Sequence, residues 1–255
     1  MKTLISYNVN GIRSAMSKGF LNWLATAQPD VLCLQETKAQ PDQLTPDILN
    51  PPGYYTYWHS AQKKGYSGVA ILCKEEPRQL AYGCGIEKYD LEGRVLRADF
   101  DGYSVMSVYL PSGSSGEDRQ GVKEEFLADF LPYLQQLKTE IPNLVVCGDF
   151  NICHEAIDIH DPVGNKKSSG FLPHERAWMS ELIAAGFTDV YRKLNPSVKK
   201  YSWWSFRFQA RLKNKGWRID YHMVTDALAA KCTSADILND VEHSDHCPVM
   251  MTLDV

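Results

Sequence analysis

The sequence lacks the long hydrophobic run that a membrane-spanning helix requires. Nowhere do about 18 apolar side chains follow one another, and the chain opens without the basic segment and long hydrophobic stretch of a secretory signal. We therefore predict a soluble protein with no membrane partner. A disordered tail protein is excluded as well, because 44% of the 255 residues are hydrophobic, enough for one sizeable core.

The sequence also lacks paired cysteines. Its seven cysteines are odd in number and have no C-x-x-C spacing, and several, such as Cys33 and Cys147, lie inside apolar runs. This pattern favours free, buried thiols in a reducing compartment, and hence a cytoplasmic protein, over a disulfide framework. The run His243-x-x-His246-Cys247 has no second Cys/His pair at a spacing suited to zinc, so we interpret His243 as a solvated side chain.

An excess of positive charge is absent too. The 27 Lys and Arg against 31 Asp and Glu give a net charge of −4, which argues against binding nucleic acid by overall charge alone. Positive charge is concentrated in residues 199–218, where seven Lys and Arg and no acid alternate with six aromatic side chains, while the rest of the chain carries 20 positive and 31 negative groups. We interpret this basic aromatic segment as a surface for a phosphate backbone. The alternative is an amphipathic core segment with a solvated basic edge.

Short apolar runs predict strands along the whole chain. They cover residues 3–9, 31–35, 68–73, 95–100, 103–110, 144–147, 219–225 and 248–253. Helical patterns cover residues 19–27 and 123–138, and Pro132 should kink or divide the second of these. A third helix is predicted from Pro173 to a stop at Gly186, with Trp178, Leu182 and Ile183 on one side.

This mixture of elements predicts an α/β protein in which two packed sheets carry helices on their outer faces. There is no internal repeat and no long Pro/Gly/Ser linker, so we expect residues 1–255 to form a single domain. Residues 111–116, with the sequence PSGSSG, directly follow a predicted strand. Because this run is short, it favours an active-site loop over a domain linker.

Polar side chains that can bind a divalent cation or transfer protons cluster at six strand ends. They are Asn8, Asn10, Gln35, Glu36, Tyr109, Asp149, Asn151, Asp220, Asp245 and His246. Any one of them alone could be an ordinary turn residue, but six strand ends with such groups favour one shared site. Carboxylate and amide oxygens with little imidazole are ligands that suit Mg²⁺ or Mn²⁺.

Seven segments of the chain, in order, strongly resemble the exonuclease III family of apurinic/apyrimidinic endonucleases, within the wider endonuclease/exonuclease/phosphatase superfamily. They are NVNGIR at 8–13, LQETK at 34–38, GDFN at 148–151, GNKK at 164–167, YSWW at 201–204, GWRIDY at 216–221 and SDHCP at 244–248. The resemblance implies a four-layer α/β sandwich of two mixed sheets packed face to face. It also implies Mg²⁺-dependent hydrolysis of duplex DNA on the 5′ side of an abasic site, removal of groups that block 3′ ends, and 3′ to 5′ exonuclease action.

The resemblance also implies roles for single residues. Glu36 corresponds to the main metal ligand, and Asp245, Asn8 and Asn10 complete its shell directly or through water. Asp149 orients and deprotonates the attacking water and Asn151 is its partner; both are also candidates for a second metal position. Tyr109 lies beside the scissile phosphate, and His246, backed by Asp220, contacts a phosphate oxygen either as an electrostatic clamp, which we favour, or as a base.

For DNA, the resemblance implies that Trp203 and Trp217 wall a pocket for a flipped-out abasic sugar. Asn165 and Lys166 hold the neighbouring backbone, and Arg207 belongs to the basic aromatic segment. Asn10, Ser112 and Ser168 depart from the pattern, since some members carry Asp at the first position and related enzymes often carry Asn at the other two. We expect a monomer that binds duplex DNA with abasic sites or blocked 3′ ends.

Two other functions fit part of this pattern. One is a superfamily phosphatase or phosphodiesterase that acts on inositol phosphates, lipids or RNA, and the basic aromatic segment counts against it. The other is a non-catalytic DNA-binding module. A loss of catalytic carboxylates or of the histidine would mark such a module, yet all of them are present.

Overall fold

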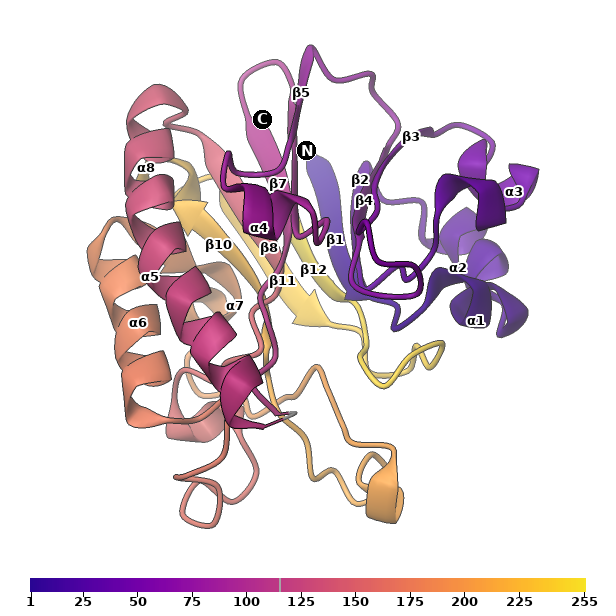
Figure 1. Cartoon of the computed structure of the whole chain (residues 1–255). Coiled ribbons are helices and arrows are strands. Elements are labelled where there is room, and N and C mark those ends of the chain that lie inside the picture. Colours follow the sequence, from indigo (N-terminus) through magenta and orange to yellow (C-terminus); the bar gives the residue numbers. More distant parts are fainter. Residues whose placement is uncertain (115) are drawn as a thin grey trace.

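The computed structural model describes residues 1–114 and 116–255, and arranges their helices and strands in four layers (Figure 1). The first six-stranded sheet has the order β11-β12-β1-β2-β4-β3. Its strands are β1 (Lys2–Asn8), β2 (Val31–Gln35), β3 (Tyr55–His59), β4 (Val69–Cys73), β11 (Cys232–Ile237) and β12 (Val249–Leu253). Its β1 and β2 pair in parallel, and its other neighbours are antiparallel.

The second six-stranded sheet has the order β5-β6-β7-β8-β10-β9. Its strands are β5 (Gln79–Tyr82), β6 (Val95–Asp99), β7 (Ser104–Tyr109), β8 (Leu144–Asp149), β9 (Phe187–Asp189) and β10 (Asp220–Thr225). Here β7 and β8 pair in parallel and the other neighbours are antiparallel. Both sheets are therefore mixed, as the predicted α/β sandwich requires.

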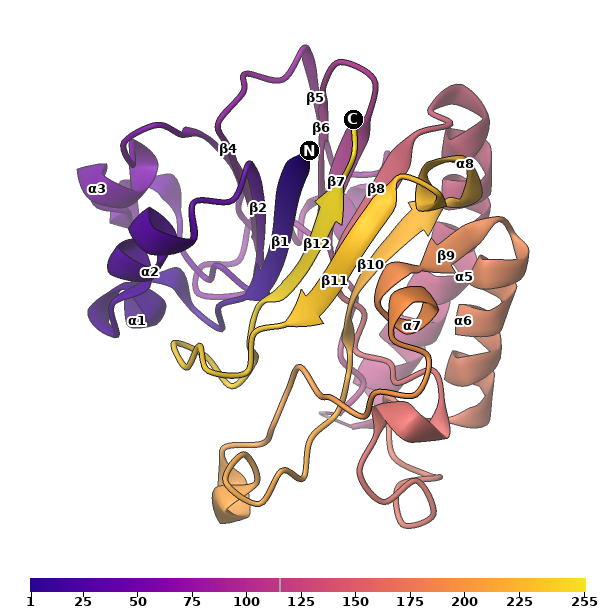
Figure 2. The ribbon, with the colours of Figure 1, turned by 180° about the vertical axis from the view of Figure 1, so that it is seen from behind.

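Helices cover the two outer faces of the sandwich (Figure 2). α1 (Ile12–Ser17), α2 (Phe20–Ala27) and α3 (Pro46–Leu49) pack on the first sheet, and α5 (Glu117–Glu140) and α6 (Pro173–Ala184) on the second. Shorter helices are α4 (Glu87–Asp90), α7 (Val190–Leu194), α8 (Asp226–Ala229) and the 3₁₀ turns η1 (Pro41–Gln43), η2 (Ala156–Asp158) and η3 (Arg207–Gln209). One apolar layer fills the space between the two sheets. A second lies between the first sheet and its helices, and a third between the second sheet and its helices.

All eight predicted strands are present, but four further strands were missed. These four, β3, β5, β9 and β11, are the edge strands of the two sheets. Edge strands have a neighbour on one side only, and three of the four keep most of their residues partly or fully exposed. Their sequences therefore lack the continuous apolar runs by which interior strands are recognised.

Three expectations about side chains need correction. Pro132 lies inside α5 but does not divide it, because both Pro132 and Ala128, whose carbonyl loses its helical partner, face solvent. Ile183 of α6 was expected on the buried side of the helix but is 37% exposed. Met179 is buried in the core instead. His243 is only partly solvated: it is half-buried, and its ring packs beside Tyr7, Phe20 and Trp23.

The expectation of free cysteines is met, since all seven are free and all except the half-buried Cys84 are buried. Within the two described stretches, no helix combines the length and the apolar character that a bilayer crossing needs. Both chain termini lie at one end of the sandwich, and the long loops around η2 and η3 project from the opposite end (Figure 1).

Candidate active site

A cavity of about 830 Å³ opens at the end of the sandwich from which the long loops project. Its lining includes nine of the sequence-predicted site residues and the glycine-rich loop after β7. The predicted residues are Asn10, Glu36, Tyr109, Asp149, Asn151, Trp203, Trp217, Asp245 and His246, and Ser168, which departs from the family pattern, also lines the cavity. From the loop at 111–116, Ser112, Gly113, Ser114 and Gly116 line the cavity, and Ser115 lies outside the described residues.

The strand ends deliver these side chains through sharp left-handed turns. Asn10 after β1, Glu36 after β2 and Asn151 after β8 have φ values of 44°, 49° and 52°. Such backbone conformations cost non-glycine residues roughly 1 kcal/mol or more each. Backbone hydrogen bonds across the turns offset this cost, for example from Gly11 N to Glu36 O at 2.7 Å. Each strand therefore ends at the cavity rim with its polar side chain turned inward.

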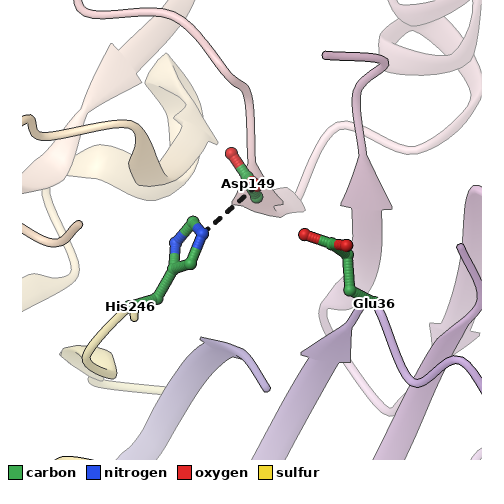
Figure 3. A group of neighbouring side chains, drawn as sticks. All are labelled: Glu36, Asp149 and His246. Carbon is green, nitrogen blue, oxygen red and sulfur yellow. Dashed lines mark ion pairs between the residues drawn. The ribbon is translucent and has the colours of Figure 1, made fainter. Parts of the chain in front are cut away.

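Glu36, Asp149 and His246 point toward one another in the cavity (Figure 3). One potential ligand atom of each lies within 4.8 Å of the other two. The Nδ2 atom of Asn8 donates to Glu36 Oε1 and to Asp149 Oδ2, both at 2.9 Å, and so links the two sheets. The Asn8 Oδ1 atom accepts from Asn10 N, so it is the amide nitrogen of Asn8 that faces the two carboxylates.

Asp245 lies at the opposite wall of the same cluster. Its Oδ1 accepts from Asn10 Nδ2 at 2.9 Å and its Oδ2 from Trp203 Nε1 at 3.0 Å. Burial alone raises the pKa of this carboxyl, but His246 and the hydrogen bonds from Asn10, Trp203 and Ser244 together hold it below its usual value. Asp245 is therefore a fixed negative charge at the rim.

The Asp149 carboxyl is fully enclosed at the bottom of the cavity. Its Oδ1 accepts from Asn151 N at 2.8 Å. Burial raises the pKa of Asp149 to about 8; the charge of His246 opposes this, and Asp220 and Glu36 add to it. A positive charge placed beside Asp149 would lower this pKa and restore the ionised carboxylate. The site therefore favours the binding of a cation.

His246 and Asp220 form a buried pair. The Nδ1 atom of His246 lies 2.9 Å from Asp220 Oδ2, which also accepts from Ser202 Oγ at 2.6 Å. Burial alone lowers the pKa of His246, but Asp220, followed by Asp149 and Asp245, raises it to about 10. The imidazole is therefore a cation at neutral pH, with Nε2 directed at Asp149 Oδ2 over 3.8 Å.

Tyr109 ends β7 with its ring in the cavity wall. Burial, strengthened by Glu36 and Asp149, raises the pKa of its phenol well above the ordinary value, so the hydroxyl keeps its proton. Arg94 was not predicted from the sequence, yet its buried guanidinium donates to Tyr109 O at 2.9 Å and stacks 5.0 Å from the ring centroid. No motif marks Arg94, because its role depends on strand pairing.

Trp203 and Trp217 form one side of the cavity. Their backbones pair, and their rings meet edge to face at 5.9 Å and 87°. Gly170, with φ +93°, closes in behind them, and a Cβ there would lie 2.9 Å from the Trp217 ring. Only glycine lets the chain approach this wall so closely.

The other predicted DNA-binding residues lie outside the described lining of this cavity. The Asn165 side chain donates to the carbonyls of His160 and Asp161 and so stabilises its own turn. Lys166 and Arg207 are exposed on the neighbouring loops, and Lys167, the last residue of the GNKK segment, reaches the lining.

The basic aromatic segment of residues 199–218 is split between structure and surface. Arg218 is fully buried and pairs with Asp158 and Asp189, so its charge does not face a ligand and the prediction for it was wrong. Arg211 donates to three backbone carbonyls and stacks on Trp204. The tip of the segment is open to solvent, with Phe206 70% and Phe208 86% exposed beside Arg207, Lys213 and Lys215.

Comparison with known proteins finds a matching family model and similar proteins that span nearly the whole chain. The model of the Endonuclease/Exonuclease/phosphatase family matches residues 5–246. An exodeoxyribonuclease of Bacillus subtilis is 42% identical over 254 residues, which cover 99% of each chain. The DNA repair nuclease APEX1 of Danio rerio is also 42% identical, over 99% of this chain and 82% of the relative.

Solved structures agree with the sequence relatives. The 3′ phosphatase NExo from Neisseria, bound to a product DNA hairpin, superposes with a TM-score of 0.92 at 28% identity, over the full length of both chains. The two mixed sheets with their outer helices are thus an arrangement that this structure shares.

Proposed function

The chain belongs to the endonuclease/exonuclease/phosphatase family, and we propose that it is a DNA repair nuclease that hydrolyses the phosphodiester 5′ of abasic sites in duplex DNA. It also removes blocking groups from 3′ ends and degrades DNA from 3′ to 5′. Its 42% identity to an exodeoxyribonuclease and to a DNA repair nuclease supports this activity. The observation that carries the proposal is the convergence of Glu36, Asp149 and His246 in one cavity walled by two tryptophans.

The proposed cofactor is Mg²⁺, with Mn²⁺ as a substitute. The donor set fits a hard divalent ion, since carboxylates dominate it and no thiolate takes part. Glu36 and Asp245 would hold the ion with the amides of Asn10 and Asn8, and Asp149 with Asn151 would form a second position. For Asn8 this requires its amide oxygen, which now accepts from Asn10 N, to turn toward the ion. When bound, the ion neutralises the charge that develops on the phosphoryl oxygens.

The protein side chains supply the rest of the chemistry. Asp149, whose raised pKa of about 8 a bound cation would lower and whose Oδ1 accepts from Asn151 N, is the proposed base that orients and deprotonates the attacking water. His246 is a cation at working pH, which supports a role as an electrostatic clamp on the phosphate rather than as a base. The Tyr109 hydroxyl remains protonated and can donate to a phosphate oxygen.

Damage recognition rests on the shape of the cavity. A nucleotide without a base costs less to extrude from the duplex and would lie against the wall that Trp203 and Trp217 form together. The exposed tip around Arg207, together with Asn165 and Lys166, would contact the backbone on either side. This open basic surface also supports DNA over a small soluble phosphoester as the substrate.

A product assay tests the proposal. Labelled duplexes that carry an abasic site, a 3′-phosphate, a recessed 3′ end or no lesion are incubated with the protein, with and without Mg²⁺. We expect incision 5′ of the abasic site that requires Mg²⁺ and falls by about 10²- to 10⁴-fold in Asp149→Asn. Turnover of a soluble phosphoester without incision would instead assign a superfamily phosphatase, and salt-sensitive binding without any cleavage would assign a DNA-binding module.

We further propose that residues 1–255 act as one catalytic domain and as a monomer. Pairing of β1 with β12 supports the first point, since it joins distant parts of the chain in one sheet. The seven free cysteines support a reducing compartment, the cytoplasm, as the location.

A further inference from the structure

The Lys38 side chain lies in the candidate site although the chemistry proposed above does not use it. Its Nζ is 2.7 Å from Glu36 Oε2 and donates to Asn10 Oδ1 at 2.5 Å. Both partners belong to the proposed metal shell. An ammonium group therefore already occupies oxygens that a divalent ion would need.

The backbone beneath Lys38 holds it in place. Glu36 and Lys38 both adopt left-handed conformations, with φ values of 49° and 50°. Lys38 N donates to Ser67 O at 2.9 Å, and Thr37 N donates to Gly68 O at 3.1 Å. Because these bonds fix the main chain, the ammonium can leave Glu36 only by rotation of its side chain.

The structure offers space for such a rotation. Lys38 lines the main cavity and also a second, solvent-open hollow of about 350 Å³. The other residues of the hollow are Gly11, Arg13, Ser14 and Gly65. The Lys38 side chain is 31% exposed where it now lies, so water already reaches it.

We propose that Lys38 is a built-in counter-cation of the metal site, which neutralises Glu36 in the metal-free protein and which the divalent ion must displace into the hollow beside Arg13. The inference rests on the proposed function, because it takes Glu36 and Asn10 as metal ligands. Two cations cannot share the same oxygens without strong repulsion at this distance. Lys38 therefore weakens metal binding, and in return it keeps the carboxylate paired while the metal is absent.

Titration of the metal-free protein with Mn²⁺ in the absence of DNA, followed by electron paramagnetic resonance, tests this role. We expect Lys38→Met to bind Mn²⁺ about tenfold more tightly than the wild type, because both the competition and the repulsion are removed. Lys38→Arg keeps the charge and should stay within about threefold of the wild type. Lys64→Met removes the same charge from the exposed loop beside the hollow and is the matched control.

Unchanged or weaker Mn²⁺ binding by Lys38→Met overturns the proposal, as does equal tightening by Lys64→Met. If the wild type binds Mn²⁺ and Lys38→Met binds it no better, only the role of Lys38 fails. If none of the proteins binds Mn²⁺, the proposed metal site fails as well. Should Lys38→Met not fold, Lys38→Gln gives the same comparison with a polar side chain.

Discussion

At the scale of single residues, burial and neighbouring charges together set the chemistry of the candidate site. Asp149 and His246 are both enclosed, yet the pKa of the carboxyl rises to about 8 and that of the imidazole to about 10. Burial alone would lower the pKa of His246. Asp220 has the largest effect in the opposite direction and raises this pKa. Asp220 is therefore a positioning and charging residue that acts through the imidazole.

Replacement of Asp220 tests this dependence. Asp220→Asn should keep the hydrogen bond geometry but lower the pKa of His246 toward the ordinary value of 6.5. Incision should then fall as the pH rises above neutrality, because the imidazolium is lost. NMR titration of His246 in the metal-free variant checks the pKa directly, and a pKa that stays near 10 would contradict the assignment.

A second histidine affects stability rather than catalysis. His222 lies in the closed interior of β10, and burial lowers its pKa from 6.5 to about 3. Within the described residues its Nε2 has no hydrogen-bond partner. Between pH 6.5 and 3 the unfolded chain binds a proton that the folded protein excludes, so the free energy of unfolding falls as the pH falls through this window.

His222→Phe should remove this acid sensitivity. From pH 7 to pH 5 the wild type should lose roughly 2 kcal/mol through this group, since one pH unit corresponds to about 1.4 kcal/mol. Urea unfolding at the two pH values measures the difference, and His174→Gln, at an exposed position, is the control. Equal acid losses in His222→Phe and the wild type would refute the prediction.

At the scale of elements, buried polar contacts hold the helices and loops against the site. The Nζ of Lys123 in α5 donates to Asn151 O at 2.8 Å and to Glu175 Oε1 of α6 at 2.6 Å. Glu175 Oε2 accepts from Gly170 N and Leu172 N. Both side chains are fully buried, so this ion pair connects the turn that carries Asn151 to the loop behind Trp217.

Breaking the pair on one side should be costly. Lys123→Met leaves Glu175 buried without its cation, and we expect a loss of about 3–5 kcal/mol in the free energy of unfolding. The double variant Lys123→Met/Glu175→Gln removes both charges and keeps an acceptor for the Gly170 amide, so it should recover most of that loss. Chemical denaturation of the wild type, the single variant and the double variant measures the three free energies of unfolding. A double variant as unstable as Lys123→Met would argue against a charge effect.

The exposed loop around η3 has the opposite character, because it buries little and presents aromatic rings to solvent. Stacking of unpaired bases on such rings contributes about 1–3 kcal/mol per base. Phe206→Ser/Phe208→Ser should therefore weaken the binding of a duplex with a single-stranded overhang about tenfold or more while the thermal stability hardly changes. Tyr82→Ser, at an exposed position of β5 outside the cavity lining, should leave DNA affinity as it is. Fluorescence anisotropy with a labelled duplex measures both.

At the scale of the whole molecule, the two sheets bring carboxylates close together at the site end of their interface. Asn8 from the first sheet bridges Glu36 and Asp149, and a buried seam beneath it joins Ser6, Gln35 and Ser107 through hydrogen bonds. The sandwich is thus held by apolar contacts over most of its interface and by polar contacts at the site end. A bound cation should stabilise this end, because it relieves repulsion between carboxylates of different sheets.

Metal binding should therefore raise the stability of the entire fold. At about 100 times its Kd, Mg²⁺ should add roughly 2.7 kcal/mol to the free energy of unfolding. Glu36→Gln should lose most of this increment, since it removes the principal proposed ligand. Calorimetry with and without Mg²⁺ gives the two increments; an undiminished increment in Glu36→Gln would mean that the ion binds elsewhere.

By itself, the sequence determined the eight interior strands, the main helices and the identity of the polar groups at the strand ends, because apolar runs and turn residues are local signals. Only the tertiary structure decided the four edge strands, whose exposed faces hide them in the sequence. It alone also joined Lys38 to Asn10, Arg94 to Tyr109, and Arg218 to Asp158 and Asp189, as these contacts link residues well separated in the chain. The reason is physical: hydrogen bonds, ion pairs and pKa shifts depend on distance and burial, which arise only when the two sheets pack together.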